Sequence, residues 1–398
     1  MNGKLFLKQY VKMFAQNCVL PIQYALGCRK PVRPNLVVFA DAHHDGRPES
    51  MELLYEALKN HGGLELREMY LNYQKASPRA VMRHMFAFMK LYAQAGCVVI
   101  CDNFLPAASC RKRRGTRVVQ LWHACGALKK FGYDTTDDIP KQYHGNVFRN
   151  TSLVTVSAPH CVEPFASAMK LGKRAVQPLG ISRTDLYFRG GWREACRTEF
   201  YRLYPQARGK RVVLWAPTFR GSPGAPVLPR MDLARLQQRL GEDWLVLCRV
   251  HPHMHERYKD MDCKMPTERL FPVVDVLIAD YSSLIFEYLL FDKPLVLYAP
   301  DLEEYQKKRG FYFDYADIPG YQVRQEEALP NAILQEYQAR KYSVRQEGPF
   351  GREQQYHNVP EDDGRLLRAN REQFLETYMS SCDGYATQRI VEYIVKER

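Results

Sequence analysis

The sequence lacks several features that would each assign a class of protein at once. No run of about 18 apolar residues occurs, so we expect no membrane-spanning helix. No C-x-x-C pair occurs among the 11 cysteines, which argues against a structural zinc site. No glycine-rich loop of the dinucleotide or P-loop type is present, which argues against a dehydrogenase and a kinase. Solenoid repeats and low-complexity tracts are also missing.

What the sequence does contain is length and positive charge. At about 150 residues per domain, its 398 residues predict two or three compact units. With 57 Lys and Arg against 44 Asp and Glu, the net charge is +13. That excess indicates an anionic partner: nucleic acid, a phosphate-bearing substrate or an acidic membrane surface. Cysteines such as Cys97, Cys101 and Cys248 lie in apolar runs, which is typical of buried thiols in a reducing compartment.

The first twenty residues carry the pattern of a basic amphipathic helix. Lys4, Lys8, Lys12 and Gln16 recur every four residues and would form one stripe, while apolar residues fill most of the remaining circumference. Such a helix is predicted to lie on a membrane surface. A signal peptide is disfavoured because lysines interrupt its apolar region. A helix packed on the protein's own core remains the alternative.

Short β-branched runs alternate with helical patterns along most of the chain, which predicts an α/β protein with parallel sheets. The first series has strands at 35–41, 97–102, 118–122 and 153–157 and helices at 49–60 and 78–95. The second has strands at 212–216, 244–250, 274–279 and 295–298 and helices at 192–204, 232–240 and 282–290. Gly190-Gly191 separates the two series.

These patterns divide the chain into four expected regions. Residues 1–30 form the membrane-surface helix, 31–188 a first Rossmann-like domain, 189–370 a second, and 371–398 terminal helices. Within the second domain, residues 326–363 are expected to be surface helix and loop. Two such domains facing each other would create a central cleft lined by the carboxyl ends of the strands, where ligands bind in open α/β sheets.

A histidine follows one of the predicted strands of the first domain. His123 comes directly after the strand and is followed by small residues, including Gly126, and then by Lys129-Lys130. This order would place an imidazole and two cations at the rim of the sheet, where the imidazole can serve as a general base towards a hydroxyl. A structural histidine is the alternative.

A second histidine motif, Arg249-Val250-His251-Pro252-His253, ends a strand of the second domain. With His255 it suggests a metal site, but no set of carboxylates of ligand type lies nearby, so an electrostatic role for His251 is preferred. The acidic pair of Asp260-Met261-Asp262 lies between lysines and is interpreted as solvated surface.

Three further motifs place polar residues at predicted strand ends. Asp280-Tyr281-Ser282-Ser283, with Glu287 one turn later, combines hydroxyls and a helix N-terminus, which favours a phosphate site; a simple serine N-cap is the alternative. Pro217-Thr218-Phe219-Arg220 and Gly180-Ile181-Ser182-Arg183 each place an arginine beside hydroxyls, as a diphosphate site requires.

Four stretches resemble the motifs of one known family. They are Trp122-His123 with Leu128-Lys129-Lys130-Phe131-Gly132-Tyr133-Asp134, then Ala216-Pro217-Thr218-Phe219-Arg220, then Asp280-Tyr281-Ser282-Ser283 with Glu287, and Arg309-Gly310-Phe311-Tyr312-Phe313-Asp314-Tyr315 before Pro319-Gly320. The chain is similar to the CDP-glycerol glycerophosphotransferase family of teichoic-acid primases and polymerases. The resemblance implies a GT-B fold. It departs from the family at Ala124-Cys125-Gly126-Ala127, where the family has Gly-Thr-Pro.

The resemblance also implies roles for the matched residues. His123 matches the histidine proposed to deprotonate the acceptor hydroxyl, and His251 matches the one thought to assist the departing phosphate. Substrate binding is expected of Gly126, Lys129, Arg183, Pro217, Thr218, Arg220, Pro252, Ser282, Ser283 and Glu287. No metal or cofactor is expected.

The predicted function is transfer of an alditol phosphate, with glycerol phosphate favoured, from a CDP-alditol to a hydroxyl of a lipid-linked or glycan acceptor. CMP is released, and the product is a teichoic-acid-like or capsular polymer made at the cytoplasmic face of the membrane. CDP-ribitol as the donor, or a GT-B glycosyltransferase using a nucleotide sugar, are the alternatives. A nucleic-acid-binding protein is disfavoured because Arg111-Lys112-Arg113-Arg114 is the only dense basic run.

Overall fold

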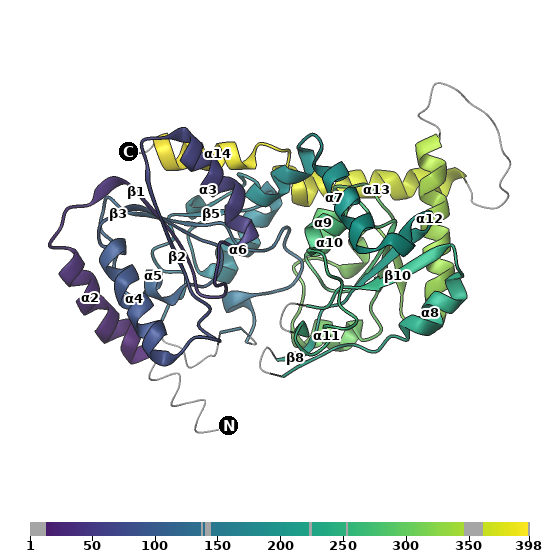
Figure 1. Cartoon of the computed structure of the whole chain (residues 1–398), viewed down its shortest axis with the longest axis horizontal. Helices are drawn as coiled ribbons and strands as arrows, with labels where there is room; N and C mark the ends of the chain where they lie inside the picture. The colour runs from purple at the N-terminus through teal and green to yellow at the C-terminus, as the bar shows by residue number, and fades with distance from the viewer. Residues whose placement is uncertain are drawn as a thin grey trace. The chain divides into compact units, whose positions relative to one another are not determined.

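A computed structural model describes residues 13–136, 138–139, 145–222, 225–251, 254–345 and 361–396. The chain forms two compact units (Figure 1). Unit 1 comprises residues 1–188 and 379–398, and unit 2 comprises residues 189–378. The C-terminal region is therefore divided: residues 371–378 belong to unit 2, whereas residues 379–398 belong to unit 1.

Unit 1 is built on a six-stranded sheet in the order β2-β1-β3-β4-β5-β6, in which all neighbours are parallel. Its strands are β1 (Arg33–Asp41), β2 (Glu65–Tyr70), β3 (Ala95–Ile100), β4 (Arg117–Gln120), β5 (Leu153–Thr155) and β6 (Val176–Gln177). Its helices are α2 (Leu20–Gly27), α3 (Glu49–His61), α4 (Pro78–Tyr92), α5 (Leu105–Ala108), α6 (Val162–Met169) and α14 (Ala386–Lys396). Short helical turns are η1 (Ala15–Val19), η2 (Gly132–Asp134), η3 (Pro159–Cys161), η4 (Lys173–Ala175) and η5 (Ser182–Phe188).

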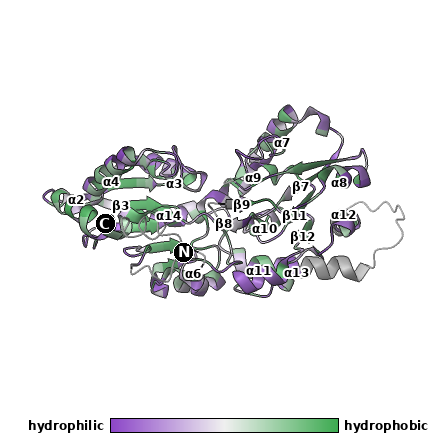
Figure 2. Cartoon of the chain, turned by 90° about the horizontal axis from the view of Figure 1, so that it is seen from below, coloured by the Kyte–Doolittle hydropathy of each residue, from purple (hydrophilic) through white to green (hydrophobic). Residues whose placement is uncertain are grey.

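Helices cover both faces of this sheet. Successive residues of a strand point to opposite faces, so each strand contributes apolar side chains to two separate clusters. On one face, Val38 of β1 and Val98 of β3 pack with α2, α4 and α5. On the other, Val37 and Phe39 of β1 pack with α3 and with α14 from the far end of the chain. Burial on both faces explains the continuous apolar runs from which these strands are predicted (Figure 2).

The N-terminal helix differs in part from its prediction. Lys4, Lys8 and Lys12 lie outside the described residues. Gln16, expected on the polar stripe, is buried, and Leu20 and Tyr24 continue its line into the core beside α4. Helix α2 therefore packs on the protein's own core, which is the alternative to a position on the membrane surface. The exposed side instead carries Phe14, Ile22 and Leu26.

Unit 2 contains a five-stranded parallel sheet in the order β10-β7-β11-β12-β13 and a two-stranded antiparallel ribbon. The strands are β7 (Arg211–Ala216), β10 (Trp244–Cys248), β11 (Val276–Ala279), β12 (Leu295–Tyr298) and β13 (Tyr321–Val323), with β8 (Arg220–Ser222) and β9 (Ala225–Val227) in the ribbon. The helices are α7 (Trp192–Leu203), α8 (Leu233–Leu240), α9 (Thr267–Leu270), α10 (Leu284–Leu289), α11 (Leu302–Lys308), α12 (Leu329–Arg345) and α13 (Glu361–Met379). Short turns are η6 (Pro205–Ala207), η8 (Tyr315–Asp317) and η9 (Glu326–Ala328).

Two elements of unit 2 add to the predicted pattern. Helix α12 lies in the region predicted to be surface helix and loop: Asn331, Gln335 and Gln338 are exposed, while Leu329, Ala332 and Ile333 pack with α8 against one face of the sheet. Strand β13 was not predicted, because only three residues of it pair with β12. In unit 1 the edge strand β2 was missed for another reason: its side chains are half-buried or exposed, so its sequence lacks an apolar run.

The C-terminal helix α14 belongs to unit 1 through specific polar contacts. The Asp185 carboxylate accepts hydrogen bonds from the backbone N–H groups of Ala386 (3.1 Å) and Thr387 (2.7 Å), at the helix N-terminus. A carboxylate at this position satisfies free N–H groups and complements the helix dipole. Among the described residues, no helix is long and apolar enough to cross a membrane.

Candidate functional site

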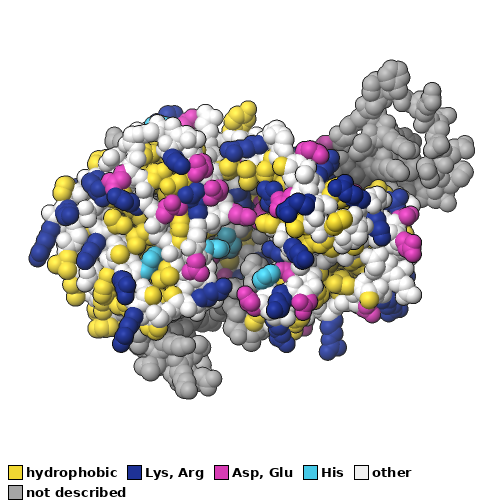
Figure 3. Space-filling model, viewed as in Figure 1, with side chains coloured by type: hydrophobic (Ala, Val, Ile, Leu, Met, Phe, Trp, Pro, Cys, Tyr) yellow, Lys and Arg dark blue, Asp and Glu magenta, His cyan; other side chains and the backbone are white. Residues whose placement is uncertain are grey.

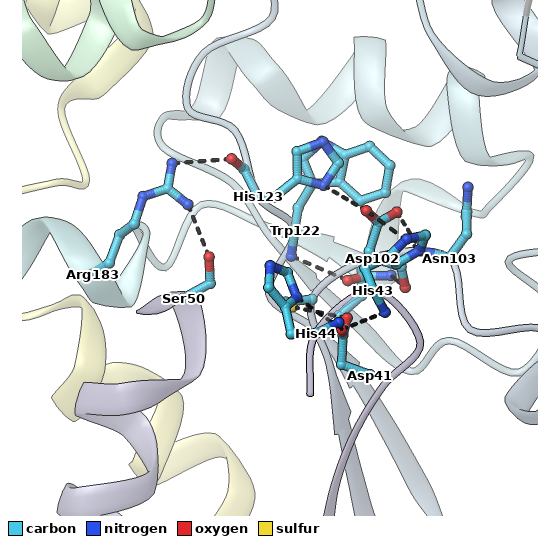
Figure 4. Close-up of polar contacts among 11 residues, drawn as sticks. Asp41, His43, His44, Ser50, Asp102, Asn103, Trp122, His123 and Arg183 are labelled. Carbon is cyan, nitrogen blue, oxygen red and sulfur yellow. Dashed lines mark hydrogen bonds and ion pairs between the residues drawn. The ribbon is translucent and has the colours of Figure 1, made fainter. Parts of the chain in front are cut away.

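Three neighbouring strands of unit 1 deliver polar side chains to one edge of the sheet. Strand β1 ends at Asp41, Asp102 follows β3, and His123 follows β4. These strands are adjacent and parallel, so their carboxyl ends meet at the same edge. Figure 4 shows His43, His44 and Asp41 beside Asp102 and His123.

The backbone and the ring of His123 are both held. Trp122 adopts the left-handed conformation (φ 57°), which is rare for a bulky residue, and its N–H donates to Gln120 Oε1 (3.1 Å). The Trp122 and His123 ring centroids lie 4.4 Å apart. Arg183 Nη2 donates to the His123 carbonyl (3.1 Å). The imidazole itself is 51% exposed, so an incoming hydroxyl can reach it.

The surroundings of this imidazole lower its pKa. Desolvation by the surrounding protein lowers the pKa of His123; the Asp102 carboxylate opposes this, and the Arg183 guanidinium adds to the lowering. His123 Nδ1 lies 3.4 Å from Asp102 Oδ2. An accessible imidazole with a lowered pKa and a carboxylate behind it is suited to act as a general base.

A second carboxylate organises the loop after β1. Asp41 Oδ2 accepts the backbone N–H groups of His43 (2.7 Å) and His44 (2.8 Å), and it lies 2.9 Å from His44 Nδ1. Burial raises the pKa of Asp41, but these hydrogen bonds outweigh it and leave the pKa lowered. Asp41, His43, His44 and Asp102 were not singled out from the sequence. A signal was present, since Asp41 and Asp102 each end an apolar strand run.

The Arg183 motif is assigned to unit 1 by its contacts. Besides the His123 carbonyl, Arg183 contacts Ser50 Oγ through Nη1 (3.0 Å). Gly180 is required by packing, because a Cβ there would lie 2.1 Å from the Ser381 carbonyl oxygen. The motif therefore supports the His123 loop and receives α14. The contact of Arg183 with a donor diphosphate stays a prediction.

The two other residues predicted near His123 also have defined places. Gly126 is buried with φ +62°, a conformation that favours glycine, and its N–H donates to Ser157 Oγ (2.9 Å). Lys129 is half-buried. Gly126 thus shapes the loop that leads from His123 to the lysine pair.

In unit 2, Arg220 is the centre of an ion-pair network. It donates to both oxygens of Asp301 (2.6 and 2.8 Å), to Asp280 Oδ2 (2.8 Å) and to the Thr218 carbonyl (2.7 Å). Its guanidinium carbon also lies 4.8 Å from the ring centroid of Tyr281. Two carboxylates thus pair with this cation. The role of Arg220 as a diphosphate ligand stays a prediction.

The hydroxyl-bearing residues lie around this network. Pro217 and Thr218 are buried; the Thr218 N–H donates to Asp280 Oδ1 (2.8 Å), whereas its Oγ1 has no partner among the described residues. Ser282 and Ser283 are half-buried before the short helix α10, and Ser282 Oγ accepts the Leu284 N–H (3.4 Å). Glu287 is buried within α10.

The loop after β10 contradicts one prediction. Asp262 is buried and accepts hydrogen bonds from the Val250 N–H (2.9 Å) and Arg249 Nη1 (3.0 Å), and it lies 2.6 Å from His255 Nδ1. It is therefore not solvated surface: pairing beside Cys248 brings it under the loop that carries His251. His251 is half-buried and its ring contacts Phe219 (4.8 Å between centroids). Pro252 and His253 lie outside the described residues.

Known proteins resemble the chain along most of its length. It is 30% identical to the teichoic acid ribitol-phosphate primase of Bacillus spizizenii over 92% of both chains. It is 29% identical to the teichoic acid glycerol-phosphate primase of Bacillus subtilis over 62% of this chain and 67% of that protein. The chain spans about half the length of several curated teichoic acid polymerases that it matches.

A solved structure of the wall teichoic acid polymerase TagF matches with a TM-score of 0.72 at 20% identity, covering 98% of both chains. This confirms the predicted α/β class and GT-B-like fold with two parallel sheets. The model of the family described as CDP-Glycerol:Poly(glycerophosphate) glycerophosphotransferase matches residues 22–365. The sequence resemblance is thereby confirmed: the chain belongs to the CDP-glycerol:poly(glycerophosphate) glycerophosphotransferase family.

Proposed function

We propose that this protein transfers an alditol phosphate from a CDP-alditol to a hydroxyl of a lipid-linked or glycan acceptor and releases CMP. The observation that carries the proposal is the accessible His123, with Asp102 beside it, at the carboxyl edge of the unit 1 sheet in a chain of this family. The acceptor oxygen attacks the alditol-bearing phosphorus while its proton passes to His123. The new O–P bond forms as the P–O bond to CMP breaks, and CMP leaves with the electron pair.

The donor is proposed to bind to unit 2. Ser282 and Ser283 offer hydrogen bonds to phosphate oxygens, as does Thr218 Oγ1, which has no partner within the described part of the chain. His251 offsets charge on the departing phosphate. Arg220 contributes by fixing Asp280 and the Thr218 backbone. Lys129 and Gly126 remain candidates for the acceptor side, and Arg183 remains a candidate ligand of the donor diphosphate.

CDP-glycerol is the donor favoured from the sequence. CDP-ribitol is the second candidate, because the relative that matches 92% of both chains is a ribitol-phosphate primase. Nucleic acid as the partner is not supported: on the face shown in Figure 3, Lys and Arg side chains are scattered among Asp and Glu and form no dense patch.

Membrane-surface binding at the cytoplasmic face is part of the proposal. Phe14, Ile22 and Leu26 are 63%, 61% and 42% exposed on one segment, and the exposed Arg29 and Lys30 follow it. Apolar side chains flanked by cations are typical of helices that lie on anionic lipid. A lipid-linked acceptor would be reached from such a surface.

The test is CMP release from CDP-glycerol, CDP-ribitol and a UDP-sugar, each with a synthetic lipid-linked acceptor that ends in a free hydroxyl. One CDP-alditol should support turnover, and His123→Asn should reduce it by about 10²–10⁴-fold, the usual contribution of a general base. His61→Asn, an exposed histidine on α3, is the matched control and should retain activity. The proposal fails if neither CDP-alditol is turned over and neither raises the thermal midpoint on binding.

A further inference from the structure

One carboxylate oxygen of unit 1 faces two imidazoles from different loops. Asp102 Oδ2 lies 3.4 Å from His123 Nδ1 and 3.8 Å from His43 Nε2 (Figure 4). His43 comes from the loop after β1, Asp102 from the loop after β3, and His123 from the loop after β4. Three adjacent strands thus bring two histidines to a single acidic group.

The position of Asp102 is coupled to that of His123 through Gln120. Gln120 Nε2 donates to the Asp102 carbonyl (3.0 Å), and Gln120 Oε1 accepts the Trp122 N–H (3.1 Å). Asp102 Oδ1 accepts the Asn103 N–H (2.6 Å), which leaves Oδ2 towards the imidazoles. The Gln120 side chain at the end of β4 therefore links the backbone at Asp102 to the backbone that precedes His123.

The second imidazole is also held by its backbone. The His43 N–H donates to Asp41 Oδ2 (2.7 Å), and the His43 carbonyl accepts from Asn72 Nδ2 (2.7 Å). His43 is therefore presented to Asp102 by the same rigid sheet edge. Ion-pair distances longer than a hydrogen bond are common in unliganded sites, and they shorten when substrate binds.

We propose that Asp102 is the positioning residue of His123, and that His43 modulates it through the same carboxylate oxygen. This rests on the proposed function. With the His123 Nδ1–H directed to Asp102, the Nε2 lone pair is the one that takes the acceptor-hydroxyl proton. The imidazolium formed in that step is then paired with the Asp102 carboxylate. His43 competes for this oxygen, so its presence weakens the pairing.

The charged groups around His123 determine the expected signs. Asp102 raises the pKa of His123, whereas Arg183 from η5 and His43 lower it. Replacing Asp102 by Asn removes the raising influence, so the acid limb of the kcat/KM profile should move to lower pH. Replacing His43 by Asn removes a lowering influence, so the acid limb should move to higher pH.

The experiment compares Asp102→Asn, Asp102→Glu and His43→Asn in the full chain, using the CDP-alditol that supports turnover. Asp102→Asn should lower kcat by about 10²-fold or more while KM for the donor changes little, since a positioned base contributes that much. Asp102→Glu should restore part of the loss. His43→Asn should have the smaller effect on kcat. The control Glu392→Gln removes an exposed carboxylate of α14 and should match the parent.

A second readout does not depend on turnover. Selective ¹³C labelling of the histidine rings allows the His123 titration to be followed by NMR, assigned with His123→Asn, and Asp102→Asn should lower its midpoint. The proposal is overturned if Asp102→Asn leaves both kcat and this titration unchanged. It is also overturned if both Asp102 variants lose donor binding, which would indicate a structural role. If the parent protein turns over neither CDP-alditol, the proposed function fails, and the titration alone decides whether Asp102 sets the protonation of His123.

Discussion

The two sheets carry ionisable groups at equivalent edges, but they hold them differently. In unit 1, β1, β3 and β4 present Asp102 and two imidazoles at 3.4 and 3.8 Å, with His123 half exposed. In unit 2, β7, β11 and β12 present Arg220 between Asp280 and Asp301 at 2.6–2.8 Å, and Asp280 is buried. A fully satisfied polar network with a buried member makes the chain around it rigid. The contrast is between an accessible imidazole at the unit 1 edge and a rigid, fully paired cation at the unit 2 edge, which holds the loop that carries Thr218.

The largest expected effect on stability comes from Arg220→Ala. The change leaves the buried Asp280 carboxylate without its cation, which typically costs about 3–5 kcal/mol. His123→Ala removes an exposed ring and should change the free energy of unfolding by about 0.5 kcal/mol or less. Urea unfolding of both variants measures the difference. If the two variants have equal free energies of unfolding, the two sheet edges do not differ in the way described.

The second largest effect on stability is expected at the Asp301 carboxylate of unit 2, and it should depend on pH. Burial raises the pKa of Asp301, but hydrogen bonds from Arg220 and Tyr281 outweigh it and leave the pKa lowered. A lowered carboxylate pKa stabilises the fold above the unfolded pKa, and this contribution is lost as pH falls through the folded value. Asp301→Asn should therefore cost about 1–3 kcal/mol at pH 7, as for a hydrogen bond to a charged group, and less near pH 3.

Urea unfolding of Asp301→Asn and the parent at both pH values tests this. Glu163→Asn, at an exposed pair with Lys173, should show little difference from the parent at either pH. If Asp301→Asn lowers the free energy of unfolding by the same amount at pH 7 and pH 3, the ionised Asp301 is not the stabilising group.

The same contrast explains what could be predicted from the sequence. His123, Thr218 and Asp280 could be proposed as site residues because each lies at or just after the end of an apolar strand run, and the α/β class follows from those strands. Asp102 also follows a strand, but its importance depends on the spatial order β1-β3-β4, which the linear sequence does not state. Asp262 was misjudged because its burial comes from backbone pairing beside Cys248 within a polar stretch.

The smallest expected effect on stability comes from the exposed side of the N-terminal segment. Phe14→Ser with Ile22→Ser removes apolar groups from solvent, so the free energy of unfolding should change by about 0.5 kcal/mol or less. Binding to anionic lipid vesicles should nevertheless fall several-fold, because each buried CH₂ contributes about 0.8 kcal/mol to membrane affinity. The control Tyr385→Ser removes an aromatic side chain that is equally exposed, at 63%, elsewhere in unit 1. Vesicle sedimentation compares the two, and equal losses would show that general surface hydrophobicity, not this segment, governs binding. A loss confined to the N-terminal variant would extend the comparison, since unit 1 would then combine the reactive edge with the surface that reaches a lipid-linked acceptor.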